Sequence, residues 1–176
     1  RHPLMITAGS DDCHGLVGDT ARGCWQSMLM EQPGDILPID VLIVGAGIGG
    51  IAMAAHLQDI CPGHSFRIVE ARARAGGTWD LFRYPGVRSD SDMHTLGFAF
   101  APWRGGKAIA DGPDILAYLD RVMAERALDA RTQYGARVIA ADWRGAEALW
   151  HVTVASSTGI AVQTARFLYL ASGYYD

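Results

Sequence analysis

A short strand pattern followed by a glycine-rich turn constrains the fold of this chain more than any other feature. Residues 41–44 read Val-Leu-Ile-Val, and residues 45–50 then read Gly-Ala-Gly-Ile-Gly-Gly. An unbroken run of apolar, mostly β-branched residues is typical of a strand that is covered on both faces. The apolar residues 51–58 continue as a predicted helix. The sequence therefore predicts a strand, a tight turn and a helix in direct succession.

The glycines of this turn match the G-x-G-x-x-G pattern of a phosphate-binding loop. We expect Gly45 to permit the sharp turn, Gly47 to let the backbone approach a pyrophosphate, and Gly50 to let helix and strand pack closely. The start of the helix offers free N–H groups and the positive end of its dipole to the phosphates. The pattern alone also fits a glycine-rich turn that binds nothing.

A second predicted strand and an acidic residue strengthen the nucleotide interpretation. Residues 66–69 read Phe-Arg-Ile-Val and are followed by Glu70. An acidic residue about 20 positions beyond the glycine turn accepts hydrogen bonds from the ribose hydroxyls of an adenosine. Its charge repels a 2′-phosphate, which disfavours NADP at this site. The sequence thus predicts a dinucleotide site in a Rossmann-like α/β fold, with a plain βαβ unit as the alternative.

The segment after Glu70 indicates which kind of dinucleotide protein this is. Residues 76–103 read GGTWDLFRYPGVRSDSDMHTLGFAFAPW, with a second glycine pair, aromatic residues and alternating charges. Long loops of this kind often carry function. Together with the first glycine motif and Glu70, the block resembles class B flavoprotein monooxygenases, and within them the Baeyer–Villiger monooxygenases. The resemblance covers residues 40–176.

This resemblance implies that FAD is the bound nucleotide and that NADPH is the reductant. It places the glycines of the first turn along the FAD pyrophosphate and Glu70 on the adenosine ribose. The glycines are Gly45, Gly47, Gly49 and Gly50. Further cofactor-binding residues that the resemblance implies are Gly77, Thr78, Trp79, Asp80, Leu81, Arg88, Ser89, Asp90 and Val138, the last through its backbone at the adenine.

Asp90 is the predicted catalytic residue. In the family, the stretch that matches residues 88–90 lies where flavin and nicotinamide meet, and its aspartate orients an arginine from the NADPH domain. Asp90 and Asp92 also form a D-x-D pair that could bind a divalent metal ion. The neighbouring serines suggest a hydrolase, but no G-x-S-x-G elbow is present. We favour the flavin interpretation and predict no metal site.

The sequence leaves the roles of three further residues open. Trp79 could form a wall of the flavin pocket or fill the core. Arg72 and Arg74 could screen phosphate charge, although a solvated face of the loop is the interpretation that we favour.

The second half of the chain predicts one helix and three strands. Residues 111–123 read as a capped helix with Pro113 in its first turn and a core stripe formed by Ile115, Leu116, Leu119, Val122 and Met123. Residues 137–143, 149–155 and 161–170 read as strands joined by short turns, which favours an antiparallel meander. The predicted fold is therefore a Rossmann-like FAD/NAD(P)-binding domain with a parallel sheet and an antiparallel β-meander, incomplete at the C-terminus.

The two ends of the chain suggest a fragment. Residue 1 is arginine, and residues 1–39 lack a helical or strand period. We expect residues 1–39 to be an irregular, partly non-native leader, of which residues 1–29 take no part in the fold. Residues 40–176 would form the N-terminal part of an FAD-binding domain. No second G-x-G-x-x-G for NADPH is present, so we expect the isolated chain to be inactive.

Composition excludes several other classes of protein. The chain is 49% hydrophobic and 19% charged with a formal net charge of −4, which argues against disorder and against nucleic-acid binding. Three cysteines without a C-x-x-C pair fit a reducing, cytoplasmic setting. The uncharged run of residues 41–57 reads as strand, turn and helix. We therefore predict no transmembrane segment and leave peripheral membrane association open.

The expected function of the parent protein is that of an FAD- and NADPH-dependent monooxygenase. It would transfer one oxygen atom from O₂ to a small organic molecule, by converting a ketone to an ester or by oxygenating sulfur or nitrogen. The alternatives are a flavin-dependent NAD(P)H reductase without oxygenation and an inactive nucleotide-binding fragment.

Overall fold

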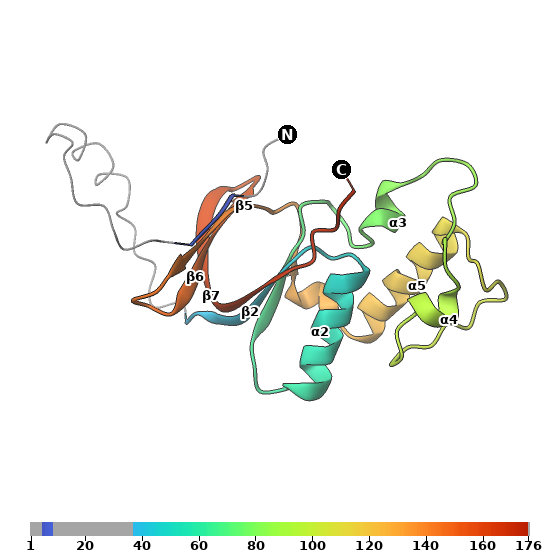
Figure 1. Ribbon diagram of the computed structural model, residues 1–176, viewed down its shortest axis with the longest axis horizontal. Coiled ribbons are helices and arrows are strands. Elements are labelled where there is room, and N and C mark those ends of the chain that lie inside the picture. Colours follow the sequence, from blue (N-terminus) through green and yellow to red (C-terminus); the bar gives the residue numbers. More distant parts are fainter. Residues whose placement is uncertain (1–4, 9–36, 176) are drawn as a thin grey trace, which may run out of the picture.

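The computed structural model describes residues 5–8 and 37–175, in which the strands form one mixed sheet (Figure 1). The strand order in the sheet is β1-β5-β6-β7-β2-β3-β4. The strands are β1 (Met5–Ala8), β2 (Ile39–Val44), β3 (Phe66–Val69), β4 (Thr132–Gln133), β5 (Arg137–Arg144), β6 (Leu149–Ser156) and β7 (Gly159–Leu170). The helices are α2 (Ile48–Ile60), α3 (Thr78–Leu81), α4 (Met93–Leu96) and α5 (Gly112–Glu125), with a 3₁₀ turn η2 (Leu128–Arg131).

Strand β2 lies at the centre of the parallel part of the sheet. It pairs in parallel with β3 on one side and with β7 on the other. Val41 and Ile43 belong to the core that contains α2 and α5, whereas Leu42 belongs to the core on the opposite face. Because alternate residues of a strand point to opposite faces, a strand buried on both faces is apolar throughout. The predicted buried strand is confirmed.

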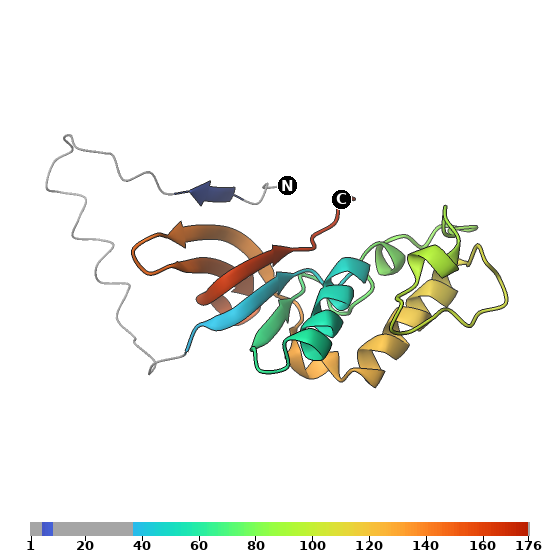
Figure 2. The same cartoon turned by 60° about the horizontal axis from the view of Figure 1, so that its bottom comes forward.

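Helices α2 and α5 pack on the same core (Figure 2). Pro113 lies in the first turn of α5, and the predicted stripe is buried except at Leu116, which is partly exposed. Tyr118 is also buried, which the stripe did not include. Its hydroxyl accepts a 2.7 Å hydrogen bond from the N–H of Phe98 and donates one of 2.7 Å to the carbonyl of Ala101. Because its side chain ends in a polar hydroxyl group, Tyr118 was not included in the predicted apolar stripe.

The predicted meander is confirmed, and its last strand joins the parallel sheet. Strands β5, β6 and β7 pair antiparallel, and the second half of β7 pairs in parallel with β2. The meander covers the face of β2 and β3 that lies away from α2 (Figure 1). The core enclosed there consists of Leu42, Val69, Ala136, Ala141, Val152, Val154 and Ala165.

Strand β1 corrects one expectation about the N-terminus. Residues 5–8 pair in parallel with β5, with Met5 opposite Ala140 and Ala8 opposite Trp143. The expectation that residues 1–29 take no part in the fold is therefore wrong for these four residues. The physical reason is that the outer edge of β5 leaves N–H and C=O groups unpaired, and an extended segment satisfies them. The rest of residues 1–29 lies outside the described residues.

None of the helices in the described ranges is both long enough and apolar enough to cross a membrane.

Candidate nucleotide-binding site

Two glycines of the first turn are required by the fold itself. Gly45 has a φ of +104°, and a Cβ placed on it would lie 2.5 Å from the carbonyl oxygen of Ala171. A Cβ on Gly50 would lie 1.9 Å from the carbonyl oxygen of Gly45. Gly45 therefore makes the turn, and Gly50 lets α2 approach it, as the sequence predicted for both.

Gly47 is different, because the protein around it would accept a side chain. Its φ is −80°, and a Cβ there would meet the Cα of Gly77 at 3.5 Å, an ordinary contact. Gly77 itself has a φ of +52°, and its own Cβ would lie only 2.8 Å from the Cα of Gly47. The two glycine loops thus face one another across bare backbone, and the N–H of Gly76 donates a 2.9 Å hydrogen bond to the carbonyl of Ala46.

Helix α2 begins where the two glycine loops meet. Gly47 is its N-cap, and no side chain caps the first turn. The N–H groups of residues 48–50 have no carbonyl partner within the helix, so they and the helix dipole are available to an anion. The exposed Gly49 lies in this first turn, where a Cβ would make only an ordinary contact with Ala171.

Glu70 lies directly beside the glycine turn. It is 6% exposed, and its two carboxylate oxygens accept hydrogen bonds from the N–H groups of Ala46 at 2.7 Å and Arg72 at 2.8 Å. The carbonyl of Glu70 accepts the N–H of Ala136, two residues before Val138. The structure therefore brings the glycine turn, the acid and the start of β5 together.

Asp80 is buried among arginines. Its carboxylate pairs with Arg72 at 2.7 Å and Arg83 at 2.5 Å, and lies 3.9 Å from Arg74. Its N–H donates to the carbonyl of Gly77, and its own carbonyl accepts from Arg83. Every polar group of Asp80 thus has a partner inside the chain. The prediction that Asp80 binds a cofactor gains no support from these contacts, which place it behind the second glycine loop.

The other residues of the short helix α3 differ in how deeply they are buried. Trp79 is partly buried and packs against the core of α2 and α5, which favours the core role left open by the sequence. Leu81 is 37% exposed, and Thr78 is half-buried at the start of the helix beside Gly77.

Asp90 lines a surface hollow of about 600 Å³. The hollow is lined by Tyr84, Gly86, Arg88, Ser89, Asp90 and Ile109. Arg88 and Asp90 are exposed, whereas the Ser89 side chain is buried and accepts the N–H of Ala110 at 3.1 Å. Extended backbone turns successive side chains to opposite sides. Arg88 and Asp90 can therefore meet a ligand, and Ser89 anchors the segment.

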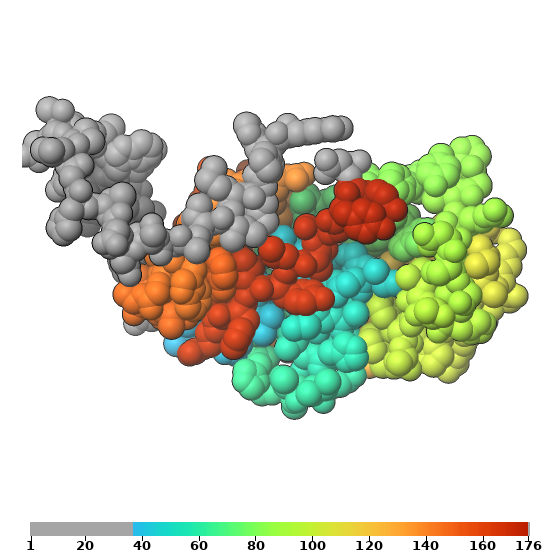
Figure 3. Space-filling model, viewed as in Figure 1, coloured from blue at the N-terminus to red at the C-terminus, as the bar shows by residue number. Residues whose placement is uncertain are grey.

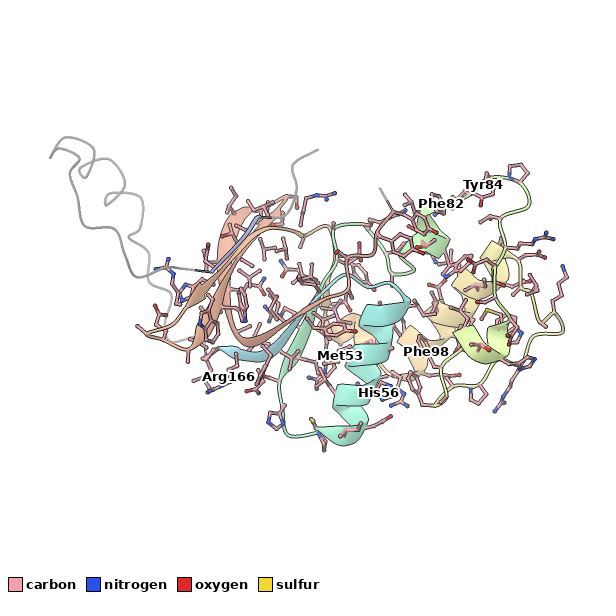
Figure 4. All side chains as sticks on the ribbon, in the orientation of Figure 1. Met53, His56, Phe82, Tyr84, Phe98 and Arg166 are labelled. Atoms are coloured by element: carbon pink, nitrogen blue, oxygen red, sulfur yellow. The ribbon has the colours of Figure 1, made fainter. Side chains whose placement is uncertain are left out.

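A cluster of aromatic side chains connects this hollow to α3. Phe82 follows α3 directly and lies next to Tyr84 (Figure 4), with ring centroids 6.0 Å apart. The ring centroid of Tyr175 lies 5.1 Å from that of Phe82. The C-terminal residues lie against the α3 region (Figure 3). The pKa of Tyr175 is raised, chiefly by its hydrogen-bonded neighbour Tyr174, and the nearby charge of Asp90 adds to the effect. The sequence interpretation missed Tyr84 and Tyr175, whose only signal was their aromatic character.

The metal interpretation of the D-x-D pair finds no support. Asp92 is the N-cap of α4, and hydrogen bonds from the hydroxyl and N–H of Thr95 lower its pKa. No group of three or more histidine, cysteine or acidic side chains suited to a metal ion occurs among residues the structure describes.

Comparisons with known proteins agree with this geometry. Residues 43–121 match the family of NAD(P)-binding Rossmann-like domains. Over 138 residues, the chain is 53% identical to the FAD-containing monooxygenase EthA of Mycobacterium tuberculosis. The structure of an oxidized steroid monooxygenase bound to NADP superimposes with a TM-score of 0.70 at 33% identity, over 78% of this chain and 26% of that one. For OTEMO in complex with FAD and NADP, the TM-score is 0.68 at 29% identity, with coverage of 78% and 26%.

The chain is a homologue of FAD-containing monooxygenases.

This homology confirms the resemblance that the glycine motif and residues 76–103 indicated, and the Rossmann-like fold is confirmed with it. The alignment with EthA includes 78% of this chain and 28% of EthA. The chain therefore spans little more than a quarter of the length of this FAD-containing monooxygenase.

Proposed function

We propose that this chain is the FAD-binding part of an NADPH-dependent monooxygenase. The whole enzyme adds one oxygen atom from O₂ to a small organic substrate, either from ketone to ester or at sulfur or nitrogen. The observation that carries the proposal is the close approach of Gly47 and Gly77 at the start of α2, next to the carboxylate of Glu70. Homology to FAD-containing monooxygenases over 78% of the chain supports it.

The residues at the start of α2 fit the pyrophosphate of FAD. The fold tolerates a Cβ at Gly47, so a bare backbone there serves a ligand rather than the packing of the protein. The N–H groups at the start of α2 suit the phosphates, and Glu70 suits the ribose hydroxyls. Bound FAD supplies the redox and oxygen chemistry, and the chain supplies binding and orientation.

Asp90 takes the role of a positioning carboxylate in this proposal. It is exposed in the hollow beside Phe82 and Tyr175, where it can hold an arginine contributed by the NADPH-binding region. A carboxylate fixed next to the reacting groups keeps the arginine in place for reduction by NADPH. We place the enzyme in the cytoplasm, in keeping with its cysteine usage.

Titration of the purified chain with FAD tests the proposal. The wild-type chain should bind FAD, and Gly47→Ala should bind it at least tenfold more weakly while its circular dichroism spectrum stays the same. Gly63→Ala is the matched control, because a Cβ at Gly63 meets no atom within 4 Å. It should bind FAD as the wild type does. Equal FAD affinity in Gly47→Ala and wild type would overturn the site.

A chimera tests the reaction. When the chain replaces the homologous segment of EthA, the product should consume NADPH and O₂ and release an oxygenated substrate. Consumption of NADPH with no oxygenated product from ketones, thioethers or amines would identify a reductase instead. A chimera that binds FAD without oxidising NADPH would leave the chain as a nucleotide-binding module.

A further inference from the structure

Three arginines surround one buried carboxylate close to the proposed nucleotide site. Asp80 is 4% exposed, and the guanidinium groups of Arg72 and Arg83 bind its two carboxylate oxygens separately. Arg74 reaches the same carboxylate only at 3.9 Å, because its guanidinium is held at 2.6 Å by Asp120. Of the three arginines, Arg72 lies nearest in the chain to the ribose acid.

Arg72 occupies a position with a known chemical use in other dinucleotide sites. It lies two residues after Glu70, and its N–H donates to that carboxylate. Where a site of this type accepts a 2′-phosphorylated adenosine, an arginine close to the ribose binds the phosphate. A guanidinium suits this task because it presents several N–H donors to phosphate oxygens in a fixed geometry.

In this chain, the Arg72 guanidinium is directed elsewhere. Within the described part of the chain, its ion pair is with Asp80, not with Glu70. The Arg72 side chain is 34% exposed and the Asp80 side chain 5%, so the pair is screened less than an ion pair on the surface. The positive charge of Arg72, which could attract a 2′-phosphate, is therefore neutralised by Asp80 in α3.

We propose that Asp80 is a specificity-determining residue, which holds Arg72 away from the ribose so that the site accepts adenosine with a free 2′-hydroxyl. The inference rests on the proposed nucleotide site. Glu70 repels a 2′-phosphate directly, and Asp80 withdraws the cation that would offset this repulsion. Asp80 acts through Arg72 and does not contact the nucleotide.

Binding of two matched probes to the 176-residue chain tests this inference. ADP-ribose and ADP-ribose 2′-phosphate differ only in the 2′-phosphate, and calorimetry gives the dissociation constant of each. The wild-type chain should prefer ADP-ribose strongly. In Asp80→Asn, which removes the charge at constant shape, the ratio of the two dissociation constants should fall about tenfold. A loss of structure alone would weaken both probes equally and leave the ratio unchanged, which would overturn the inference.

Arg72→Met provides a second test, in which the buried carboxylate keeps its ion pair with Arg83. Because Asp80 already withdraws Arg72, this variant should keep the wild-type ratio, and Asp80→Asn with Arg72→Met should restore it. A change of the ratio in Arg72→Met alone, or no restoration in the double variant, would overturn the role of Asp80. Failure of the wild-type chain to bind ADP-ribose would overturn the nucleotide site together with this inference.

Discussion

The N–H of Ala46 donates a 2.7 Å hydrogen bond to Oε2 of Glu70, which ties the glycine turn to the acid at the end of β3. The other carboxylate oxygen accepts the N–H of Arg72 at 2.8 Å. A carboxylate offers about four acceptor positions, so both oxygens can still accept ribose hydroxyls. The acid is therefore fixed in place by the protein before any nucleotide binds.

Replacing Glu70 with alanine should affect stability and binding together. The N–H groups of Ala46 and Arg72 lose their acceptor next to the core, which should lower the free energy of unfolding by about 1–3 kcal/mol. FAD binding should weaken at least tenfold, because hydrogen bonds to a charged group contribute about 1.5–3 kcal/mol. Urea denaturation and FAD titration measure the two effects. Unchanged FAD affinity would contradict the assignment of Glu70 to the ribose.

Gly50→Ala should destabilise the native fold, whereas Gly63→Ala should leave its stability unchanged. The alanine Cβ would lie 1.9 Å from the carbonyl oxygen of Gly45, and neither backbone can move without opening the turn. Overpacking of this kind costs about 1–3 kcal/mol or more. Thermal denaturation followed by circular dichroism compares the two variants. A melting temperature of Gly50→Ala within 2 °C of wild type would contradict this packing, a margin of about 0.5–1 kcal/mol for a chain of this size.

Ser89→Ala and Asp90→Ala should separate structure from function at neighbouring positions. The buried Ser89 hydroxyl binds the N–H of Ala110, so its loss should cost about 1–3 kcal/mol of stability. Asp90 is exposed, and its replacement should change stability by less than about 0.5 kcal/mol. Chemical denaturation of both variants checks the contrast. Equal destabilisation would show that Asp90 also anchors the segment.

In a chimera with EthA, Asp90→Ala should retain FAD but slow its reduction by NADPH. A misplaced arginine next to the reacting groups can lower the rate about a hundredfold. Stopped-flow absorbance of the flavin under anaerobic conditions measures the step. Wild-type reduction rates in this variant would refute the positioning role of Asp90.

Tyr118→Phe should destabilise the protein and reduce its sensitivity to alkaline pH. The N–H of Phe98 and the carbonyl of Ala101 lose their partner, at a cost of about 1–3 kcal/mol. Burial raises the pKa of Tyr118 above 10.0, so the unfolded chain releases the proton first. Stability of the wild type should therefore fall as pH rises beyond about 10. Denaturation at pH 8 and 10.5 should show a smaller loss in Tyr118→Phe, and an equal loss would argue against the shift.

The sequence determined the local elements and the chemistry of the first turn. The apolar run of residues 41–44 predicted a strand buried on both faces, and the glycines after it marked a tight turn. The distance to Glu70 then predicted an acid beside that turn. These features follow from residue types and their spacing within a single βαβ unit.

Tertiary structure decided which of the marked residues can meet a ligand. The family resemblance assigned Asp80, Ser89 and Asp90 to one cofactor site, but the fold buries Asp80 among arginines and holds Ser89 against Ala110, leaving Asp90 exposed. It likewise distinguished Gly50, where a Cβ would clash with backbone, from Gly47, where a Cβ would make an ordinary contact. These outcomes depend on contacts between segments far apart in the chain, such as Arg74 with Asp120, and no local pattern encodes such contacts.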